Sequence, residues 1–546
     1  MLKTKIIETT PYNDQKPGTS GLRKKTSVFA SGNYLENYIE AVFETLAESS
    51  GKTLVLGGDG RYFNAEAIQV IIKMAAARGF ARVLVGQNGI LSTPAASCVI
   101  RKRGAFAGIV LSASHNPGGP EGDFGVKLNL ANGGPAPESV TNAIYEASKK
   151  ITSFAIADAP DVETARLGTT LVGNTMVEVF DPIEDYEELL SEIFDFGAIA
   201  ALFKKPGFKM RYDALNAVTG PYAKRILEGA LGAPEGTVVN AVPLPDFGGL
   251  HPDPNPLYAR DLIEKLSDPE LGYTFGAASD GDGDRNMIVG RGQFVSPSDS
   301  LAVITANARL IPAYKDGIAG VARSMPTSCA VDLVAADLGI PCYETPTGWK
   351  FFGNLLDAGK VTICGEESSG TGADHVREKD GLWAVLCWLS IMAATGKSAE
   401  ELLYKHWEKY GRNFYSRHDY ENISKDAGER IMETLRRKIG TLAHKSVDGL
   451  LIEKADEFSY KDPVDGSTAS RQGIRIFFER GSRIVFRLSG TGTVGATLRV
   501  YLERYDNDAS LYRADVQSVL LPLITAAQTL AEIEKISGRQ APSVIS

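Results

Sequence analysis

Short apolar runs alternate with longer helical patterns along most of the chain. The run at 53–57 (TLVLG) precedes a helical pattern at 65–79, and the run at 82–86 precedes another at 91–104. The same rhythm returns at 208–218 and across 335–366. Buried strands that alternate with helices are typical of βαβ units in a parallel sheet. This part of the chain is therefore predicted to form α/β domains.

The C-terminal part has a different pattern. Residues 473–479, 483–487 and 496–503 alternate like antiparallel strands, and a helix is predicted over 509–537. We predict three related α/β domains with mainly parallel mixed sheets and a C-terminal α+β domain, arranged around one central cleft. The predicted limits are 1–190, 191–298, 299–418 and 419–546. The longest apolar run, 382–394, is too short to span a bilayer and is predicted to be a buried core helix.

Composition and charge exclude some partners. The chain has 546 residues, too many for one hydrophobic core, and its net charge is -9. A nucleic-acid binder needs a basic surface, whereas a small anion needs only a local cluster of cations. The five scattered cysteines indicate free buried thiols in a reducing compartment, and residues 1–15 lack an apolar signal segment. We expect a cytoplasmic protein that binds neither nucleic acid nor membrane.

Four polar loops each follow an apolar, strand-like run. They are SHNPGG (114–119), DGDGDR (280–285), EESSG (366–370) and SGTGTVG (489–495). In open parallel sheets, ligands bind at the carboxyl ends of strands. Loops from four domains that share this placement are predicted to converge on one cleft.

The loop at 280–285 predicts a metal site. Asp280, Asp282 and Asp284 alternate with glycines, which let the backbone turn three carboxylates inward. Such carboxylates repel one another unless a cation neutralises them, and oxygen ligands suit Mg²⁺ or Ca²⁺. An EF-hand is excluded because Arg285 and Arg291 stand where that loop needs Gly and Glu. The alternative is an acidic, solvated turn.

The loop at 487–495 contains GxGxxG, but a strand pattern follows it, whereas a dinucleotide-binding loop opens a helix. Its hydroxyl and N–H donors, flanked by Arg487 and Arg499, favour an anion cradle, most simply for phosphate. An ordinary hairpin with surface arginines is the alternative.

Three further positions are candidates for chemistry. The carboxylates and hydroxyls at 366–369 suit sugar hydroxyls, although an exposed helix start is an equal alternative. Lys379 is a candidate catalytic amine, against the more common charged helix start on a surface. Ser114 stands beside His115, but adjacent residues do not form a protease triad, and no GxSxG motif is present. A serine near a metal site and a phosphate cradle is instead predicted to carry a phosphoryl group.

Together these motifs resemble the α-D-phosphohexomutase superfamily and, within it, the phosphoglucomutase branch. The resemblance runs from 16–25 to 489–501. It rests on SASHNPGG, HPDPNP, DGDGDRN, TPTGWKFFGN, GEESSGTG and REKDGLWA. TPTGWKFFGN and REKDGLWA favour phosphoglucomutase over the bifunctional phosphomannomutase/phosphoglucomutase and phosphoglucosamine mutase branches.

The resemblance implies a role for each matching residue. Ser114 would be the phosphoserine and would hold one Mg²⁺ together with Asp280, Asp282 and Asp284. The reacting centre would be lined by Arg23, His115, Lys127 and Lys379, with Lys379 a candidate general acid or base. The implied substrate contacts are Thr19, Arg23, Arg285, Thr347, Gly348, Glu366, Ser368, Lys379, Arg487, Ser489, Gly490, Thr491 and Arg499.

The implied activity is that of an isomerase of glucose and glycogen metabolism. It would interconvert glucose 1-phosphate and glucose 6-phosphate, with glucose 1,6-bisphosphate as intermediate and activator, as a monomer or weak homodimer. A phosphomannomutase, a sugar-bisphosphate synthase and a non-catalytic phosphoprotein scaffold remain as alternatives. Two positions depart from the family pattern: Ser112 replaces a threonine, and Ser369 replaces a bulky aromatic residue, which leaves fine specificity open.

Overall fold

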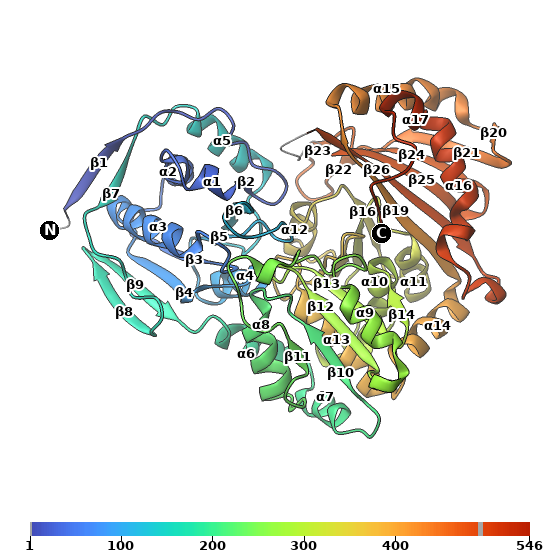
Figure 1. The fold of residues 1–546 in the computed structure, drawn as a ribbon, viewed down its shortest axis with the longest axis horizontal. Coiled ribbons are helices and arrows are strands. Elements are labelled where there is room, and N and C mark those ends of the chain that lie inside the picture. The colour runs from blue at the N-terminus through green and yellow to red at the C-terminus, as the bar shows by residue number, and fades with distance from the viewer. Residues whose placement is uncertain (1–2, 490–494) are drawn as a thin grey trace.

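A computed structural model describes residues 3–489 and 495–546, and its first unit is a seven-stranded mixed sheet. The strand order is β2-β6-β5-β3-β4-β9-β8, in which β3 pairs in parallel with β4 and β5, and β4 with β9. In Figure 1 this unit runs from blue to teal and lies on the left. Its strands are β2 (Leu22–Lys25), β3 (Thr53–Gly58), β4 (Arg82–Ile90), β5 (Ala107–Leu111), β6 (Asp123–Leu130), β8 (Gly168–Val172) and β9 (Thr175–Phe180).

The predicted alternation of strands and helices in this unit is confirmed. The apolar strand β5 is buried throughout, as a parallel strand covered on both faces must be. Helices α3 (Asn64–Arg78) and α4 (Thr93–Lys102) follow β3 and β4. Side chains on opposite faces of β3 enter two different hydrophobic clusters: Val55 enters one and Leu54 enters the other. The sheet is therefore packed on both faces, and the carboxyl ends of its central strands lie between two packed layers.

The second and third units have smaller mixed sheets. The second has the order β11-β10-β12-β13-β14, and the third has β16-β15-β17-β18. In each, the first strand pairs are parallel and the last pair is antiparallel. Their strands are β10 (Met210–Asp213), β11 (Val238–Val239), β12 (Phe275–Ser279), β13 (Asn286–Gly290), β14 (Gln293–Val295), β15 (Val321–Ser324), β16 (Cys342–Thr345), β17 (Ile363–Gly365) and β18 (Thr371–Ala373).

The fourth unit, orange to red in Figure 1, is an antiparallel sheet of the order β20-β21-β24-β25-β26-β19-β27. Helices α15 (Lys425–Leu442) and α16 (Val516–Ala531) supply its core with β24–β26. The strands are β19 (Arg412–Ile423), β20 (Ser446–Val447), β21 (Leu450–Glu457), β24 (Ile474–Phe478), β25 (Ser482–Ser489), β26 (Ala496–Asp506) and β27 (Val544–Ile545).

The single helix predicted over 509–537 is wrong. A 3-10 turn (Ala509–Leu511) comes first, and α16 and α17 (Ile533–Ser537) are separated at Glu532, whose φ is 50°. A left-handed residue ends a helix because the backbone hydrogen-bond ladder cannot continue through it. The division at 190, 298 and 418 stays a prediction, and β19 runs across the last of these limits.

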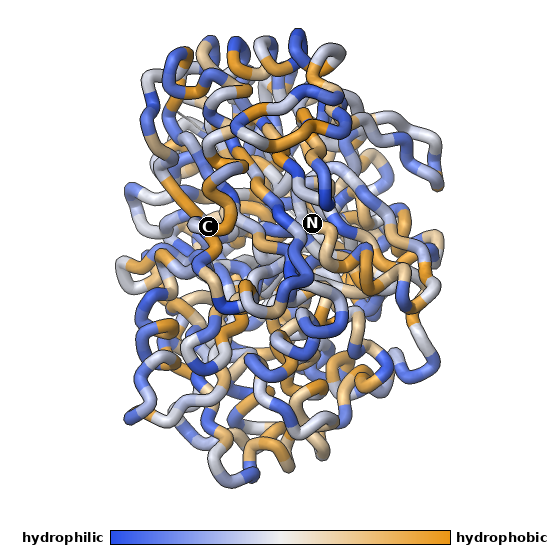
Figure 2. The backbone as a smooth tube through the Cα atoms, turned by 90° about the vertical axis from the view of Figure 1, so that its right-hand side faces the viewer, coloured by the Kyte–Doolittle hydropathy of each residue, from blue (hydrophilic) through white to orange (hydrophobic). Residues whose placement is uncertain are grey.

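The predicted core helix is α13 (Gly381–Thr395), buried along most of its length. In the described part of the chain, no single helix has the length and apolar composition to cross a membrane; α13 and α14 (Ala399–Tyr410) meet these criteria only jointly and are bent by 83°. Figure 2 shows hydrophilic turns along much of the outline and hydrophobic stretches between them. All five cysteines are free thiols; Cys98, Cys364 and Cys387 are buried, whereas Cys329 and Cys342 are only partly so.

Candidate active site

Ser114 lies in the loop that follows β5, with its side chain turned into the protein. It is 1% exposed, and its φ of 53° places a non-glycine residue in the left-handed region. Its Oγ donates to Asp280 Oδ2 at 2.6 Å, and its backbone N donates to Ser112 Oγ at 2.7 Å. The strained backbone therefore aims the serine hydroxyl at the acidic loop of the second unit.

A buried ion pair that our sequence analysis missed holds this loop from behind. Asp59 accepts from Ser112 Oγ at 2.6 Å, and Arg61 pairs with Asp59 at 2.8 Å. Arg61 Nη2 also donates to the Ser114 carbonyl at 2.7 Å. The sequence does contain a signal for this pair. Asp59-Gly60-Arg61 directly follows the apolar run of β3, just as each of the four predicted loops follows an apolar run.

The three carboxylates of the 280–285 loop converge. One oxygen each from Asp280, Asp282 and Asp284 lies within 4.8 Å of the others, and all three residues are buried. Among the described residues, Asp282 Oδ1 and Asp284 Oδ1 are buried with no hydrogen-bond partner. Burial, and then the charges of Asp284 and Asp282, raise the pKa of Asp280 well above its usual value. Crowded oxygen donors with unpartnered atoms fit a hard divalent cation, and the solvated-turn alternative is wrong.

Two lysines face this acidic cluster. Lys127 from β6 pairs with Asp282 and lies 3.4 Å from Asp284, while Lys379 lies 3.2 Å from Asp284. Burial alone would raise the pKa of Asp282, but the charge and hydrogen bond of Lys127 and a hydrogen bond from Thr93 hold it below its usual value. Lys379 is 7% exposed, so the alternative of a charged helix start on the surface is wrong.

Close backbone approach joins the loops of the first three units. A Cβ built on Gly281 would lie 2.3 Å from the Ser114 carbonyl oxygen, and one on Gly381 would lie 2.2 Å from the Arg285 carbonyl oxygen. Only glycine fits such contacts. The serine loop, the acidic loop and the start of α13 therefore form one packed assembly.

Three side chains that line this assembly each have a nitrogen atom without a hydrogen-bond partner. In the described structure, Arg23 Nε, Arg285 Nε and His115 Nδ1 are buried and make no hydrogen bond. Burial, followed by the charges of Arg285 and Arg23, lowers the pKa of His115 well below its usual value, so the imidazole is neutral at pH 7. Arg285 also lies 3.4 Å from Asp253 of the HPDPNP segment. Unpartnered donors at this density suit an anion with several acceptor oxygens.

The predicted sugar contacts lie in the third unit. The Gly348 N–H donates to Glu366 Oε1 at 2.8 Å, which joins the loop after β16 to the loop after β17. Thr347 Oγ1 is buried without a partner among the described residues, and Ser368 is half-buried. A Cβ on Gly348 would lie 3.8 Å from Thr19, which brings that exposed threonine of the first unit to the same place. Because residues 366–370 connect two strands, the helix-start alternative is wrong.

The fourth unit contributes arginines. Arg487 and Arg499 face each other across β25 and β26, and Arg487 Nη1 donates to Tyr501 Oη at 3.2 Å. Ser489 ends β25, whereas Gly490 and Thr491 lie outside the described residues. Arg417 of β19, which we did not predict, pairs with Glu367 of the third unit at 3.0 Å. That pair joins the fourth unit to the loop at 366–370 of the third unit.

Comparison with known proteins agrees along the whole chain. Models of phosphoglucomutase/phosphomannomutase α/β/α domains I, II and III match residues 14–155, 184–293 and 297–410, and a model of the phosphoglucomutase-1 C-terminal domain matches 412–543. The chain is 61% identical to a phosphoglucomutase of Rhizobium radiobacter and 52% identical to human phosphoglucomutase-1, with complete coverage of each. Its structure resembles the open form of parafusin, a Paramecium phosphoglucomutase, with a TM-score of 0.92 and 46% identity, covering 100% of this chain and 99% of that one.

Proposed function

Because the chain belongs to the phosphoglucomutases of the α-D-phosphohexomutase superfamily, we propose that it interconverts glucose 1-phosphate and glucose 6-phosphate through a phosphoserine at Ser114. The observation that carries this proposal is the Ser114 Oγ, 2.6 Å from Asp280 in a buried assembly of carboxylates and cations. Phosphoryl transfer needs little beyond positioning and charge neutralisation, and this assembly supplies both.

In the forward reaction, a hydroxyl of the bound glucose monophosphate attacks the phosphorus on Ser114. The bond between phosphorus and Ser114 Oγ breaks, and glucose 1,6-bisphosphate forms. The neutral His115 is the candidate to take the proton of the attacking hydroxyl, and Lys379, which pairs with Asp284 as a cation, is the candidate to give a proton to Ser114 Oγ as it leaves. After the sugar turns over, its other phosphoryl group returns to Ser114, so the enzyme ends as it began and the net reaction is an isomerisation.

Charge on the phosphoryl group would be balanced by a metal ion and by two arginines. Asp280, Asp282 and Asp284 would hold Mg²⁺, which when bound supplies positive charge to the phosphoryl oxygens. Arg23 of the first unit and Arg285 of the acidic loop supply fixed donors. Burial of the serine keeps water away from it, which protects a phosphoserine from hydrolysis.

The sugar must bind in two orientations, one for each phosphoryl transfer. The site therefore needs an anchor that binds the phosphate that does not react, and a clamp that binds the sugar hydroxyls, and both must serve either orientation. We assign the anchor to Arg487, Ser489 and Arg499 of the fourth unit, together with the newly found Arg417. The clamp is Thr347, Gly348, Glu366 and Ser368, and its closure over the sugar would require the fourth unit to move toward the first.

The same proposal extends to the setting of the enzyme. We expect a cytoplasmic enzyme of glucose and glycogen metabolism, monomeric or weakly dimeric, that is activated by glucose 1,6-bisphosphate. Five free thiols suit a reducing compartment. A phosphomannomutase activity is the second candidate, because the matching models of the first three units bear both names.

A coupled assay tests the proposal. Glucose 1-phosphate, a trace of glucose 1,6-bisphosphate and Mg²⁺ are supplied, and glucose 6-phosphate is followed through its dehydrogenase, with mannose 1-phosphate in a parallel series. Turnover should need both Mg²⁺ and Ser114. Absence of turnover on glucose 1-phosphate, with turnover on mannose 1-phosphate, would favour the second candidate.

A further inference from the structure

The loop that follows β15, which we term the junction loop (residues 324–329), contacts both halves of the proposed sugar clamp. Its Met325 N–H donates to the Thr345 carbonyl at 2.7 Å, where the chain enters Thr347 and Gly348. The Glu367 N–H, between Glu366 and Ser368, donates to Thr327 Oγ1 at 2.9 Å. Thr327 is 1% exposed, so water cannot replace its hydroxyl.

The fourth unit holds the opposite side of the junction loop. Arg483 donates to the carbonyls of Met325, at 2.9 Å, and Thr327. Tyr415 Oη donates to the Pro326 carbonyl at 2.8 Å, and Glu503 accepts from the Cys329 N–H at 2.7 Å. Side chains of β19, β25 and β26 thus bind the loop at four of its six residues.

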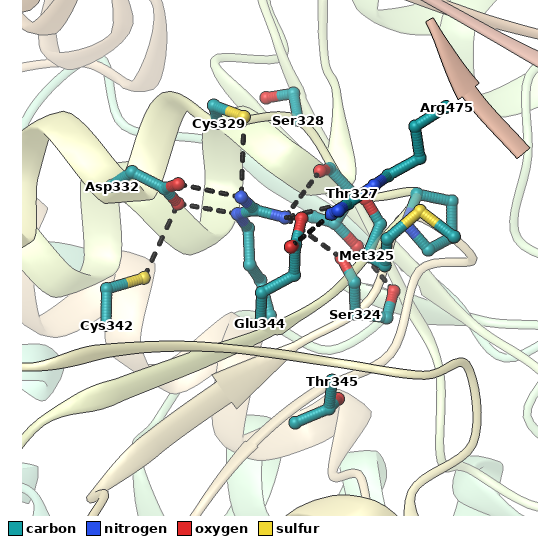
Figure 3. A network of polar contacts seen from close by, with 12 residues as sticks. Ser324, Met325, Thr327, Ser328, Cys329, Asp332, Cys342, Glu344, Thr345 and Arg475 are labelled. Carbon is teal, nitrogen blue, oxygen red and sulfur yellow. Dashed lines mark hydrogen bonds and ion pairs between the residues drawn. The ribbon is translucent and has the colours of Figure 1, made fainter. Parts of the chain in front are cut away.

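Apolar and ionic contacts reinforce this attachment. The Met325 side chain is fully buried in a cluster with Phe458, Tyr460, Val485 and Tyr501, all from the fourth unit. Figure 3 shows Glu344 beside Arg475; its two oxygens bind Arg323 at 3.0 Å and Arg475 at 2.6 Å. The base of the junction loop is therefore tied to the fourth unit through a continuous set of charges.

Building on the function proposed above, we propose that Thr327 is a positioning residue that couples the sugar clamp to the placement of the fourth unit. Its carbonyl is held by Arg483 of the fourth unit, and its hydroxyl holds the backbone between the two clamp side chains. Thr327 therefore transmits a shift of the fourth unit, which carries the phosphate anchor, to the backbone of Glu367 in the clamp. The clamp is then in its binding position only when the anchor is also in place.

Thr327→Val tests this coupling because valine keeps the volume but can neither accept the Glu367 N–H nor bond to Ser324 Oγ, which lies 2.7 Å from Thr327 Oγ1 within the junction loop. An unpaired buried N–H destabilises the clamp, and we expect kcat/KM for glucose 1-phosphate to fall about five- to fifty-fold. Thr327→Ser retains the hydroxyl and should stay within about twofold of the wild type. The inhibition constant for inorganic phosphate should not change, because Arg487 and Arg499 are untouched.

Thr362→Val is the matched control. Thr362 is also buried, and its Oγ1 accepts one backbone N–H, from Ala319 at 3.0 Å, but it precedes β17 at the end of that strand remote from the clamp. We expect Thr362→Val to lose about as much thermal stability as Thr327→Val but to keep wild-type kinetics. Should Thr327→Val not fold, Tyr415→Phe loosens the junction loop from the fourth unit instead and should lower kcat/KM about two- to tenfold.

The outcomes separate the two proposals. An active wild type with Thr327→Val kinetics equal to those of Thr362→Val would overturn the coupling role alone. A Thr327→Val enzyme whose phosphate inhibition weakens as much as its kcat/KM would overturn it as well, because the defect would then lie in the anchor. A wild type inactive on glucose 1-phosphate would overturn the proposed function and this inference with it.

Discussion

Replacing Asp59 by asparagine removes the charge that balances Arg61 directly behind the serine loop. Both side chains are fully buried, and Asp59 accepts from Arg61 Nε at 2.9 Å and from Ser112 Oγ at 2.6 Å. An uncompensated buried charge costs about 3–5 kcal/mol. At about 2–4 °C per kcal/mol for a domain of this size, the first unit should unfold about 6–20 °C lower.

The double variant Asp59→Asn, Arg61→Met separates stability from catalysis. Removing both charges often restores stability, so its unfolding temperature should exceed that of either single variant. Activity should not recover, because Arg61 also holds the Ser114 carbonyl at 2.7 Å. Without that contact the left-handed backbone of Ser114 relaxes, Oγ leaves Asp280, and a misplacement of about 1 Å lowers kcat roughly a hundredfold.

Thermal unfolding followed by circular dichroism gives the stability of the four proteins, and the coupled assay, run well below every midpoint, gives kcat. Full activity in the stable double variant would refute the positioning role of Arg61. An unchanged midpoint in Asp59→Asn would refute the assignment of a large cost to the unbalanced charge.

Three further predictions test other parts of the site and the fold. Ser114→Ala should abolish turnover without lowering the unfolding midpoint, whereas Arg487→Ala should raise KM about 10- to 100-fold through loss of a charged contact; equal kinetic profiles would contradict this division. EDTA should abolish turnover, and Mg²⁺ at about 100 times its Kd should stabilise the wild type by about 2.7 kcal/mol, but not Asp282→Asn, as calorimetry can measure. Burial, and then Lys409, lowers the pKa of His406 to about 4. Its contribution to stability is therefore full above pH 6.5 and is lost as the pH falls toward 4, by up to about 3 kcal/mol, and His406→Gln should flatten the stability profile over that window.

The four loops could be predicted because each follows an apolar run that indicates a strand, and the end of the run shows where the strand ends. Local pattern shows where a parallel strand stops, and chemistry concentrated just beyond it, as at 280–285, stands out. Asp59 and Arg61 follow the same rule but carry a single ion pair, which resembles an ordinary turn. Their role is visible only in the folded structure, where Ser112 lies between Asp59 and Ser114 and bonds to both.

Other features depend on partners that are distant in the sequence. Lys379 lies in a charged run that is typical of a surface helix start, and its burial results from Asp284 of another unit. Arg417 lies on a strand whose alternating pattern does not distinguish a site residue from a solvated one. The break at Glu532 had no local signal either, because neither glycine nor proline marks it.

The distribution of contacts among the units explains how one site can both hold and release a sugar. The loops of the first three units meet through glycine contacts at Gly281 and Gly381 that leave no room for sliding. The fourth unit reaches the proposed sugar clamp through two routes, the Arg417–Glu367 pair and the junction loop, and both include a contact to Glu367. Under the roles proposed above, motion of the fourth unit would act on the residue between Glu366 and Ser368, while the glycine contacts hold the serine and the carboxylates in place.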